Sequence, residues 1–520
     1  MENSQASVES TRTNPEANAT TSPVSSVEST ATNPEANTTT TVSADSNAQQ
    51  EGVSLTISTE YSQYLSKSSS NTLVGVNLLA PPAPSNTERA PVDCVVVSDV
   101  SASMRGPKMD LLRETGKLLL NEFVEKDRVG LVTFDSDVKE RFPLQAISKS
   151  ARSKATSIVD SFHAGTATNL SEGLFTGIRQ LINDKKANRS HVRTVLLMTD
   201  GQANHGLRSS AQIVPILTEM LKDTGITVHT FGYGAGHDSA MLREISTAGN
   251  GSYYFVEGVD DIRSAFGDCL GGMLSVVAQN LQVELEAING TSITKVHHKN
   301  AVVVEANKKY RIPFADLYGE EQRDVLLNMT LSPTIQVEED HTKPSAQILQ
   351  ASLQYIDVIA ARPATSSTSI GVCRVLEVNK TELVKNSQLD LQSIRLKVAD
   401  TIEEARKTAE KGDLKAARTT IEATRVEVKN TASRCAHVEG AKETCEAFEL
   451  DLKDCSDGLV DRNAFRSMKM KMTYLAEGHQ QQRCMESTMV MDEVGSSSLR
   501  SNAYRTKSKK GVASKFAGIF

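Results

Sequence analysis

Apolar and polar positions divide the chain into stretches of different periodicity. Residues 53–79 contain short alternating runs such as Leu73-Val-Gly-Val-Asn-Leu78, which are typical of strands. Residues 91–278 alternate continuous apolar runs with amphipathic segments at helical spacing. Residues 279–379 return to strand-like alternation, and apolar stripes at helical spacing follow from Ile394 onward. We therefore predict strands, an alternating α/β region, more strands and then helices.

The central region, residues 91–278, is expected to form a doubly wound α/β domain. Strands and helices that alternate with short links imply a mostly parallel sheet covered by helices on both faces. The first strand is followed by no G-x-G-x-x-G, and no G-K-[S/T] is present. The sequence therefore argues against a dinucleotide-binding fold and against a P-loop.

Strands on both sides of this region predict that the α/β domain is inserted into a β-sandwich. The sandwich would combine residues 53–79 with 279–379, because the termini of a compact domain often lie close together. Within the second part, Arg311–Gly319 and Val325–Leu331 flank a Gly-Glu-Glu turn and predict a hairpin. Helical hairpins that form a small bundle are expected afterwards, with Gly412-Asp413 ending one helix and capping the next.

The two ends of the chain differ from this folded part. The first residues are rich in Ser, Thr and Asn, and Ser7–Asn18 returns almost unchanged as Ser26–Asn37 without an apolar stripe. We expect disorder there and in the basic tail at the other end. The expected domains are 1–52 (disordered tail), 53–90 (strands and a Pro-rich link), 91–278 (α/β domain), 279–379 (β-sandwich), 385–487 (helical hairpins) and 488–520 (basic disordered tail).

Composition narrows the function classes. The net charge of −7, with 23% charged residues, argues against a general nucleic-acid binder. The seven cysteines include no C-x-x-C, so zinc-finger spacing is missing and reduced thiols are expected. The first residues lack a basic start and an apolar core, and no run approaches the roughly 20 apolar residues of a membrane span. We predict a cytoplasmic protein without a transmembrane segment; the sequence leaves its oligomeric state open.

A cluster of oxygen-bearing side chains follows the first strand of the α/β region. Asp99, Ser101 and Ser103 occupy alternate positions after the apolar run Val95–Val97. Alternation along an extended turn lets the three side chains converge on one point. Hard oxygen ligands suit Mg²⁺, Mn²⁺ or Ca²⁺ and not Zn²⁺.

Two more segments strengthen this candidate. Residues 165–170 form a polar loop that opens a helical pattern, and residues 195–201, VLLMTDG, form a second buried strand that ends in an acidic residue. Ligand-binding groups collect at the carboxyl ends of strands in open α/β sheets. All three segments are therefore expected to meet at one edge of the sheet.

This combination resembles the metal-ion-dependent adhesion site of von Willebrand factor type A (VWA) domains. The resemblance implies that Ser101, Ser103 and Thr168 bind the ion through their hydroxyls, while Asp99 and Asp200 hold it largely through ordered water. It also implies an open coordination position that accepts a carboxylate from a partner protein. The alternative is that the hydroxyls only cap helices and the aspartates only form turns.

The order of segments resembles intracellular VWA proteins. Among them are plant proteins that also carry a RING finger, and VWA-Hint proteins whose C-terminal part is similar to a segment of inter-alpha-trypsin-inhibitor heavy chains. The matching stretches include Pro313-Phe-Ala-Asp-Leu-Tyr-Gly-Glu-Glu321 and Ala409-Glu-Lys-Gly-Asp-Leu-Lys-Ala-Ala-Arg418. RING spacing and a Hint module are absent, so ubiquitin-ligase activity is not carried over.

The expected function is a non-enzymatic interaction module in an intracellular scaffold or adaptor, which binds an Asp or Glu carboxylate of a partner protein through Mg²⁺. The alternatives are a metal-dependent hydrolase or a ubiquitin-pathway adaptor. His163 and His205 lie close in sequence to the site, but no substrate pocket or orienting partner supports either as a base. Hydroxyl-rich ligation leaves the ion electrophilic towards a partner's carboxylate, which favours binding over hydrolysis. No catalytic residue and no organic cofactor are predicted.

Overall fold

The computed structural model describes most of the chain between residues 52 and 482. The predicted disordered tails lie outside the described residues, apart from Gly52. The described ranges are 52–85, 88–188, 190–200, 202–234, 236–256, 259–314, 316–334, 344, 346–378 and 383–482, with the backbone alone for 259–264. Within them, no helix combines the length and apolar character that crossing a bilayer requires.

The central region forms a six-stranded sheet with the order β6-β5-β4-β7-β8-β9. Its neighbouring strands run parallel except for β6, which is antiparallel to β5. The chain places β5 on one side of β4 and β7 on the other, so the strand order reverses between β4 and β7. Such a switch point is where open α/β sheets bind ligands. The strands are β4 (Val92–Asp99), β5 (Arg128–Phe134), β6 (Val138–Ala146), β7 (Val192–Thr199), β8 (Ile226–Tyr233) and β9 (Asn250–Val256).

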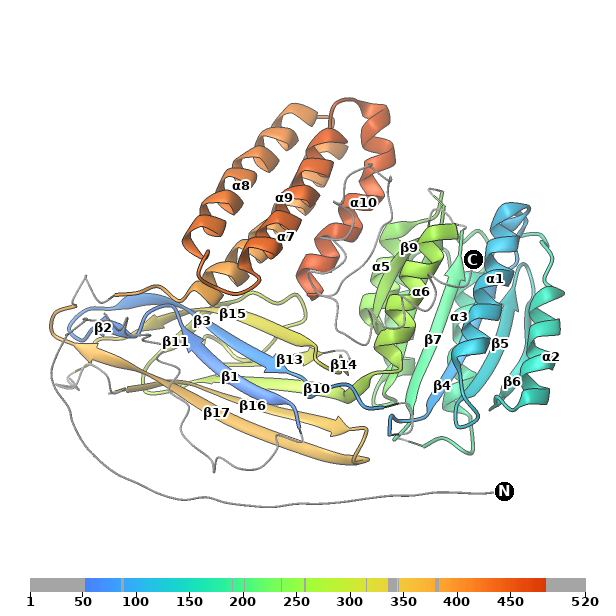
Figure 1. Cartoon of the computed structure of the whole chain (residues 1–520), viewed down its shortest axis with the longest axis horizontal. Coiled ribbons are helices and arrows are strands. Elements are labelled where there is room, and N and C mark those ends of the chain that lie inside the picture. Colours follow the sequence, from blue (N-terminus) through green and yellow to red (C-terminus); the bar gives the residue numbers. More distant parts are fainter. Residues whose placement is uncertain are drawn as a thin grey trace, which may run out of the picture. The chain divides into compact units, whose positions relative to one another are not determined.

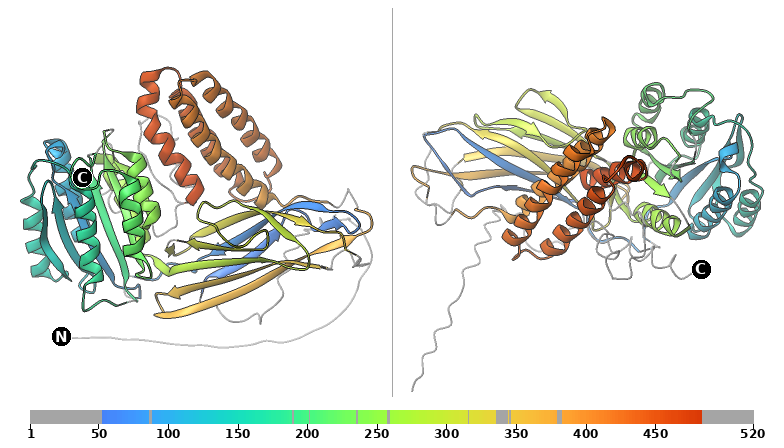
Figure 2. Two further views of the ribbon diagram at one scale, coloured as in Figure 1. Left: turned by 180° about the vertical axis from the view of Figure 1, so that it is seen from behind. Right: turned by 90° about the horizontal axis from the view of Figure 1, so that it is seen from above.

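Helices cover both faces of this sheet, as the alternating pattern predicted (Figures 1 and 2). Buried side chains of α1, α2 and α6 share one apolar cluster, and those of α3, α4 and α5 share another. The bounds are α1 (Pro107–Glu122), α2 (Lys149–Asp160), α3 (Leu170–Ile182), α4 (Ser210–Leu221), α5 (Ser239–Ala248) and α6 (Val259–Met273).

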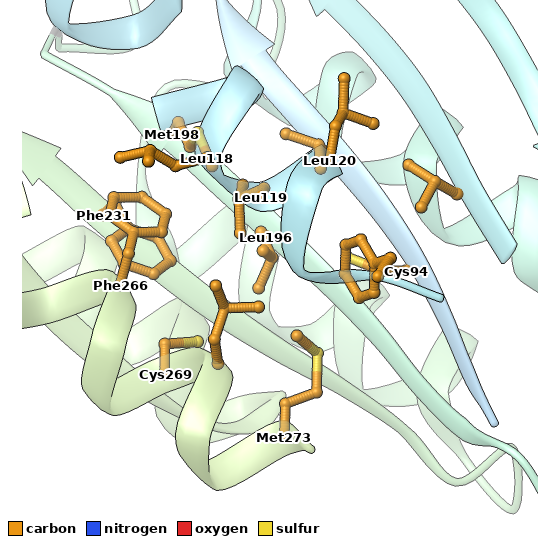
Figure 3. Close-up of a cluster of buried hydrophobic side chains, with 14 of the residues drawn as sticks. Cys94, Leu118, Leu119, Leu120, Leu196, Met198, Phe231, Phe266, Cys269 and Met273 are labelled. Atoms are coloured by element: carbon orange, nitrogen blue, oxygen red, sulfur yellow. The ribbon is translucent and has the colours of Figure 1, made fainter. Parts of the chain in front are cut away.

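The strand β4 is buried along its whole length because it faces apolar helices on both sides. Successive side chains of a strand point to opposite faces, so Cys94 and Val96 join the first cluster while Val95 and Val97 join the second. Figure 3 shows the first cluster, where leucines of α1 meet β7 and α6. Its Phe231 and Phe266 rings stack with centroids 4.0 Å apart. This two-sided burial fixes where β4 ends and therefore where Asp99 lies.

A β-sandwich surrounds the α/β domain in sequence, as predicted. One sheet has the order β1-β3-β15-β11 and the other has the order β12-β13-β10-β16-β17-β2, with β14 paired to β10. The strand β3, which precedes the α/β domain, pairs antiparallel with β15, which follows it, and Val76 lies opposite Val325. Apolar side chains of both sheets form one cluster. The strands are β1 (Ser54–Thr59), β2 (Gln63–Leu65), β3 (Ser70–Leu79), β10 (Val276–Ala287), β11 (Ser292–Val296), β12 (Val302–Glu305), β13 (Lys309–Phe314), β14 (Leu317–Tyr318), β15 (Gln322–Leu331), β16 (Ala346–Asp357) and β17 (Arg362–Val375).

The hairpin predicted for residues 311–331 is wrong. The strand β13 pairs with β10 and β12, whereas β15 pairs with β3 and β11 in the other sheet. The turn between them carries the chain from one sheet to the other because β3 already offers β15 a ten-residue partner. Long-range pairing therefore outweighs the local turn signal.

Between residues 383 and 482, four helices follow the sandwich and share an apolar cluster of their own. The predicted break at Gly412 is confirmed, since Gly412 has a positive φ of 97° and Asp413 caps α8 by accepting a hydrogen bond from the Ala416 amide. The division of the chain into domains at the expected boundaries stays a prediction. The helices are α7 (Ser387–Glu410), α8 (Leu414–Arg434), α9 (Ala441–Asp457) and α10 (Arg462–Gln481).

The last of these helices, α10, also contributes to the core of the α/β domain. Met470 and Tyr474 belong to the cluster that α3, α4 and α5 form on the second face of the sheet. The Tyr474 ring meets the ring of Tyr253 on β9 edge to face, with centroids 6.4 Å apart. Aromatic pairs in this geometry contribute roughly 0.5–1.5 kcal/mol beyond the area they bury. The helix α10 is therefore part of two cores.

Glu477 lies at the same contact and is buried. Its Oε1 accepts a hydrogen bond of 3.4 Å from the Thr247 hydroxyl, and its Oε2 lies 3.8 Å from Nε of Arg243. Burial raises the pKa of Glu477 to about 7; Arg243 and Lys299 oppose the shift, while Glu403 adds to it. The contact between α10 and α5 thus contains a carboxyl group that stays protonated at higher pH than an ordinary glutamate.

This pKa predicts a pH-dependent effect of Glu477→Gln. The folded pKa of about 7 lies above the ordinary value of 4.5. The wild-type carboxyl therefore contributes no penalty below about pH 4.5, and its penalty grows as the pH rises from there through 7. We expect Glu477→Gln to raise the free energy of unfolding by about 1–3 kcal/mol at pH 8 relative to wild type, and by much less at pH 5. Urea denaturation followed by circular dichroism at both pH values measures the difference; an equal effect at both contradicts it.

Candidate functional site

The candidate site lies at the carboxyl ends of β4 and β7, on the two sides of the switch point. Asp99 is the last residue of β4, and Asp200 directly follows β7. After Asp99 the chain passes through Ser101 into a short 3-10 turn, Ala102–Met104. The strands β4 and β7 are in register, with Ser98 opposite Met198, so both acidic residues leave the sheet at the same level.

Four of the five predicted residues are joined by hydrogen bonds. The Ser101 amide donates to Asp99 Oδ1 over 2.8 Å. The hydroxyls of Ser101 and Ser103 lie 3.0 Å apart, and the Ser103 hydroxyl donates to Asp200 Oδ1 over 2.8 Å. The structure therefore brings together Asp99, Ser101, Ser103 and Asp200, which are separated by up to about 100 residues in sequence.

Thr168 lies in a neighbouring loop, and its described hydrogen bonds involve its backbone. Its amide donates to Asn204 Oδ1 over 2.8 Å, and its carbonyl accepts from the amides of Asn204 and His205. The same loop reaches the Asp99 segment through the amide of Ala102, which donates to the Thr166 carbonyl over 2.9 Å. The loop of Thr168 is thus hydrogen-bonded to the segments after β4 and β7, while its hydroxyl forms no described bond with the other four residues.

The two carboxylates of the site are buried. The exposed fraction is 0% for Asp99 and 3% for Asp200. Burial raises the pKa of Asp99 to about 6; hydrogen bonds from Thr199 and Ser101 oppose the shift, and the charge of Asp200 adds to it. A buried carboxylate beside a second one favours a proton or a bound cation. The site therefore attracts positive charge.

Two contributors to the site, Thr199 and Lys108, and one buried neighbour, His237, were missed from sequence. The Thr199 hydroxyl donates to Asp99 Oδ2, and the Lys108 ammonium forms an ion pair with Asp200 Oδ2. His237 is buried beside this edge, and its Nε2 lies 2.6 Å from the Tyr253 hydroxyl. A lysine in the first turn of a helix is a sequence signal for Lys108, because the positive end of the helix dipole disfavours it. The sequence carries no comparable signal for Thr199 or His237.

The other polar residues near this edge have ordinary roles. His163 and His205 are exposed, and Nδ1 of His163 lies 3.1 Å from the Ser161 carbonyl in its own loop. Asp135 and Asp137 form a turn, in which the Asp137 amide donates to Asp135 Oδ1 over 2.9 Å. No described contact connects either histidine side chain to Asp99 or Asp200.

The donor set fits a hard divalent cation. No group of three or more His, Cys, Asp or Glu side chains that could hold a metal occurs in the described part of the chain, so this site depends on hydroxyls beside its two carboxylates. Oxygen donors of this kind are what Mg²⁺ and Ca²⁺ take. The Lys108 ammonium pairs with Asp200 Oδ2, so one positive charge already lies beside the two carboxylates.

Comparisons with known proteins agree with this fold. The family model of the von Willebrand factor type A domain matches residues 93–267. A solved structure, the von Willebrand factor type A protein from Catenulispora acidiphila, covers 83% of this chain and 99% of its own with a TM-score of 0.59. At 16% sequence identity this likeness shows the fold alone.

Two curated relatives share part of the sequence. The E3 ubiquitin-protein ligase WAV3 of Arabidopsis thaliana is 27% identical over 273 residues, which cover 50% of this chain and 33% of the relative. The inter-alpha-trypsin inhibitor heavy chain H1 of Bos taurus is 29% identical over 176 residues, which cover 32% of this chain and 19% of the relative. The match to each relative therefore spans a third or less of that relative's length.

Removing the Thr199 hydroxyl should destabilise the fold. In Thr199→Val the side chain keeps its shape, but Asp99 Oδ2 loses a buried donor. A buried acceptor left unsatisfied costs about 1–3 kcal/mol, so we expect a loss of this size in the free energy of unfolding. Chemical denaturation in EDTA measures it, with Thr199→Ser as the control that retains the hydroxyl. Equal losses in the two variants would assign the effect to packing instead.

Proposed function

We propose that this chain, whose residues 93–267 form a von Willebrand factor type A domain, binds a carboxylate of a partner protein through a divalent cation. Domains of this family typically mediate protein interactions and are generally not enzymes. The proposed ligands are Asp99, Ser101, Ser103, Thr168 and Asp200, and the proposed ion is Mg²⁺, with Mn²⁺ or Ca²⁺ as substitutes.

The hydrogen-bonded network of four of these side chains carries the proposal. It links the ends of β4 and β7, and its two carboxylates are buried where a cation is the natural counter-charge. Hydroxyls add oxygen donors without adding negative charge. An ion held in this way keeps enough electrophilic character to bind an acidic side chain from another molecule.

The residues of the site have different roles in this binding. Asp99 receives the Ser101 amide and the Thr199 hydroxyl, so its carboxylate is oriented before any ion arrives. Ser103 is exposed, whereas Ser101 is buried, so the side of the network at Ser103 faces solvent and is open to an incoming carboxylate. A bound divalent ion would supply the positive charge that attracts this carboxylate.

A scaffold or adaptor in the cytoplasm is the setting that we propose for this binding. The helical segment and the sandwich would then position the metal edge, which we define as Asp99, Ser101, Ser103, Thr168 and Asp200, for contact with a partner. Ubiquitin-ligase activity is named for the plant relative only. We do not propose it for this chain, because its sequence lacks RING spacing.

Metal binding by the purified protein tests the proposal. We expect about one Mg²⁺ per chain by isothermal titration calorimetry, or one Mn²⁺ by electron paramagnetic resonance. Asp99→Asn keeps the shape of the side chain and removes its charge, so the affinity should fall at least tenfold. Asp110→Asn is the matched control, because Asp110 is an exposed acid of α1 that pairs with Arg113. Wild-type protein that binds no divalent ion contradicts the proposal.

Partner capture tests the second half. A protein partner retained in Mg²⁺ should be released by EDTA and should fail to bind Asp99→Asn. Adding free glutamate-rich peptide should compete, whereas the glutamine equivalent should not. Retention that is the same under all these conditions would mean that the partner uses another surface.

A further inference from the structure

The ammonium group of Lys108 places a positive charge at the metal edge. Its Nζ forms an ion pair with Asp200 Oδ2, while Oδ1 of the same carboxylate accepts the Ser103 hydroxyl. The side chain of Asp200 is 0% exposed and that of Lys108 is 36% exposed. The lysine therefore reaches from a partly open position onto a buried carboxylate.

The position of Lys108 in α1 is unfavourable for the helix itself. Pro107 is the first residue of α1 and Gly106 is its N-cap, so Lys108 lies in the first turn, next to the positive end of the helix dipole. A cation there destabilises an isolated helix. The ion pair with Asp200 offsets this cost, which gives the lysine a role at the site.

The stem of Lys108 passes close to a second segment. Gly234, the residue after β8, has a positive φ of 67°, and a Cβ added there would lie 3.4 Å from Lys108 Cε, so the glycine leaves room for the stem. The lysine thus lies between the residue after β7 and the residue after β8. Its ammonium reaches the buried carboxylate of Asp200.

We propose that Lys108 is the counter-cation of the metal-free site and that a divalent ion displaces it from Asp200. This inference rests on the proposed metal binding and adds its regulation. Asp99 and Asp200 present two negative charges, and the single ammonium neutralises part of them when no ion is bound. Binding of Mg²⁺ requires the ammonium to give up its bond to Asp200 and places two like-signed charges near each other. Lys108 therefore lowers the affinity for the ion and keeps the metal-free domain folded.

Mg²⁺ titrations of the full chain test this inference. Lys108→Gln should bind Mg²⁺ at least tenfold more tightly than wild type, because the competing charge is gone. Lys108→Arg keeps the charge and should stay within about threefold of wild type. Lys117→Gln is the matched control, since Lys117 lies on the same helix and pairs with Glu114 and Asp160 away from the site. It should leave the affinity unchanged.

Thermal unfolding gives an independent readout. In EDTA, Lys108→Gln should unfold at a lower temperature than wild type, and saturating Mg²⁺ should raise its unfolding temperature by more than it raises that of wild type. A variant that folds only with Mg²⁺ also supports the displacement. A variant that is unfolded under both conditions overturns it, because the ammonium would then be needed even when the ion is present.

The outcomes separate this inference from the proposed function. If wild type binds Mg²⁺ and Lys108→Gln binds it equally or more weakly, the displacement is overturned and the metal site remains. If wild type binds no Mg²⁺ but Lys108→Gln does, the lysine is confirmed as the occupant. If neither binds, both proposals fail.

Discussion

Two buried carboxylates at the end of a parallel sheet impose the main physical constraint on this molecule. An ionised carboxylate away from water is costly unless donors and cations surround it. The protein meets this need for Asp99 with an amide and a hydroxyl from its own backbone loop and from β7, and for Asp200 with a hydroxyl and an ammonium. The loops after β4 and β7 and the first turn of α1 supply most of these groups.

The topology of the sheet determines where hydrogen-bond donors and cations can reach Asp99 and Asp200. Because the strand order reverses between β4 and β7, the helices that follow these strands, α1 and α4, lie on opposite faces of the sheet. The loop before α3 completes the edge, with Asn169 capping the helix. The sheet is rigid because both of its faces are covered by apolar helices, so the polar groups are held by a fixed frame.

Much of this arrangement could be predicted from the sequence. The apolar run Val95–Val97 and its counterpart before Asp200 have the length and composition of buried strands, and the carboxyl ends of such strands meet at one edge. Local signals also located the helix break at Gly412. These features depend on a few neighbouring residues, which is why a single sequence reveals them.

The features that could not be predicted depend on distant partners. The pairing of β15 with β3 brings together segments about 250 residues apart, and no local pattern records that choice. The ion pair of Lys108 with Asp200 spans 92 residues and depends on the angle at which α1 leaves the loop. The edge strand β6 could not be predicted from the apolar pattern, because exposed positions interrupt that pattern.

The helix α10 has a consequence for the order of events during synthesis. Tyr474 covers Tyr253 in the finished protein, but the ribosome makes it about 220 residues later. Because synthesis proceeds at roughly 5–20 residues per second, α5 and β9 are made on the order of ten to forty seconds before the part of α10 that packs on them. A nascent chain therefore exposes the apolar side chains of this surface of α5 and β9 until α10 has been synthesised.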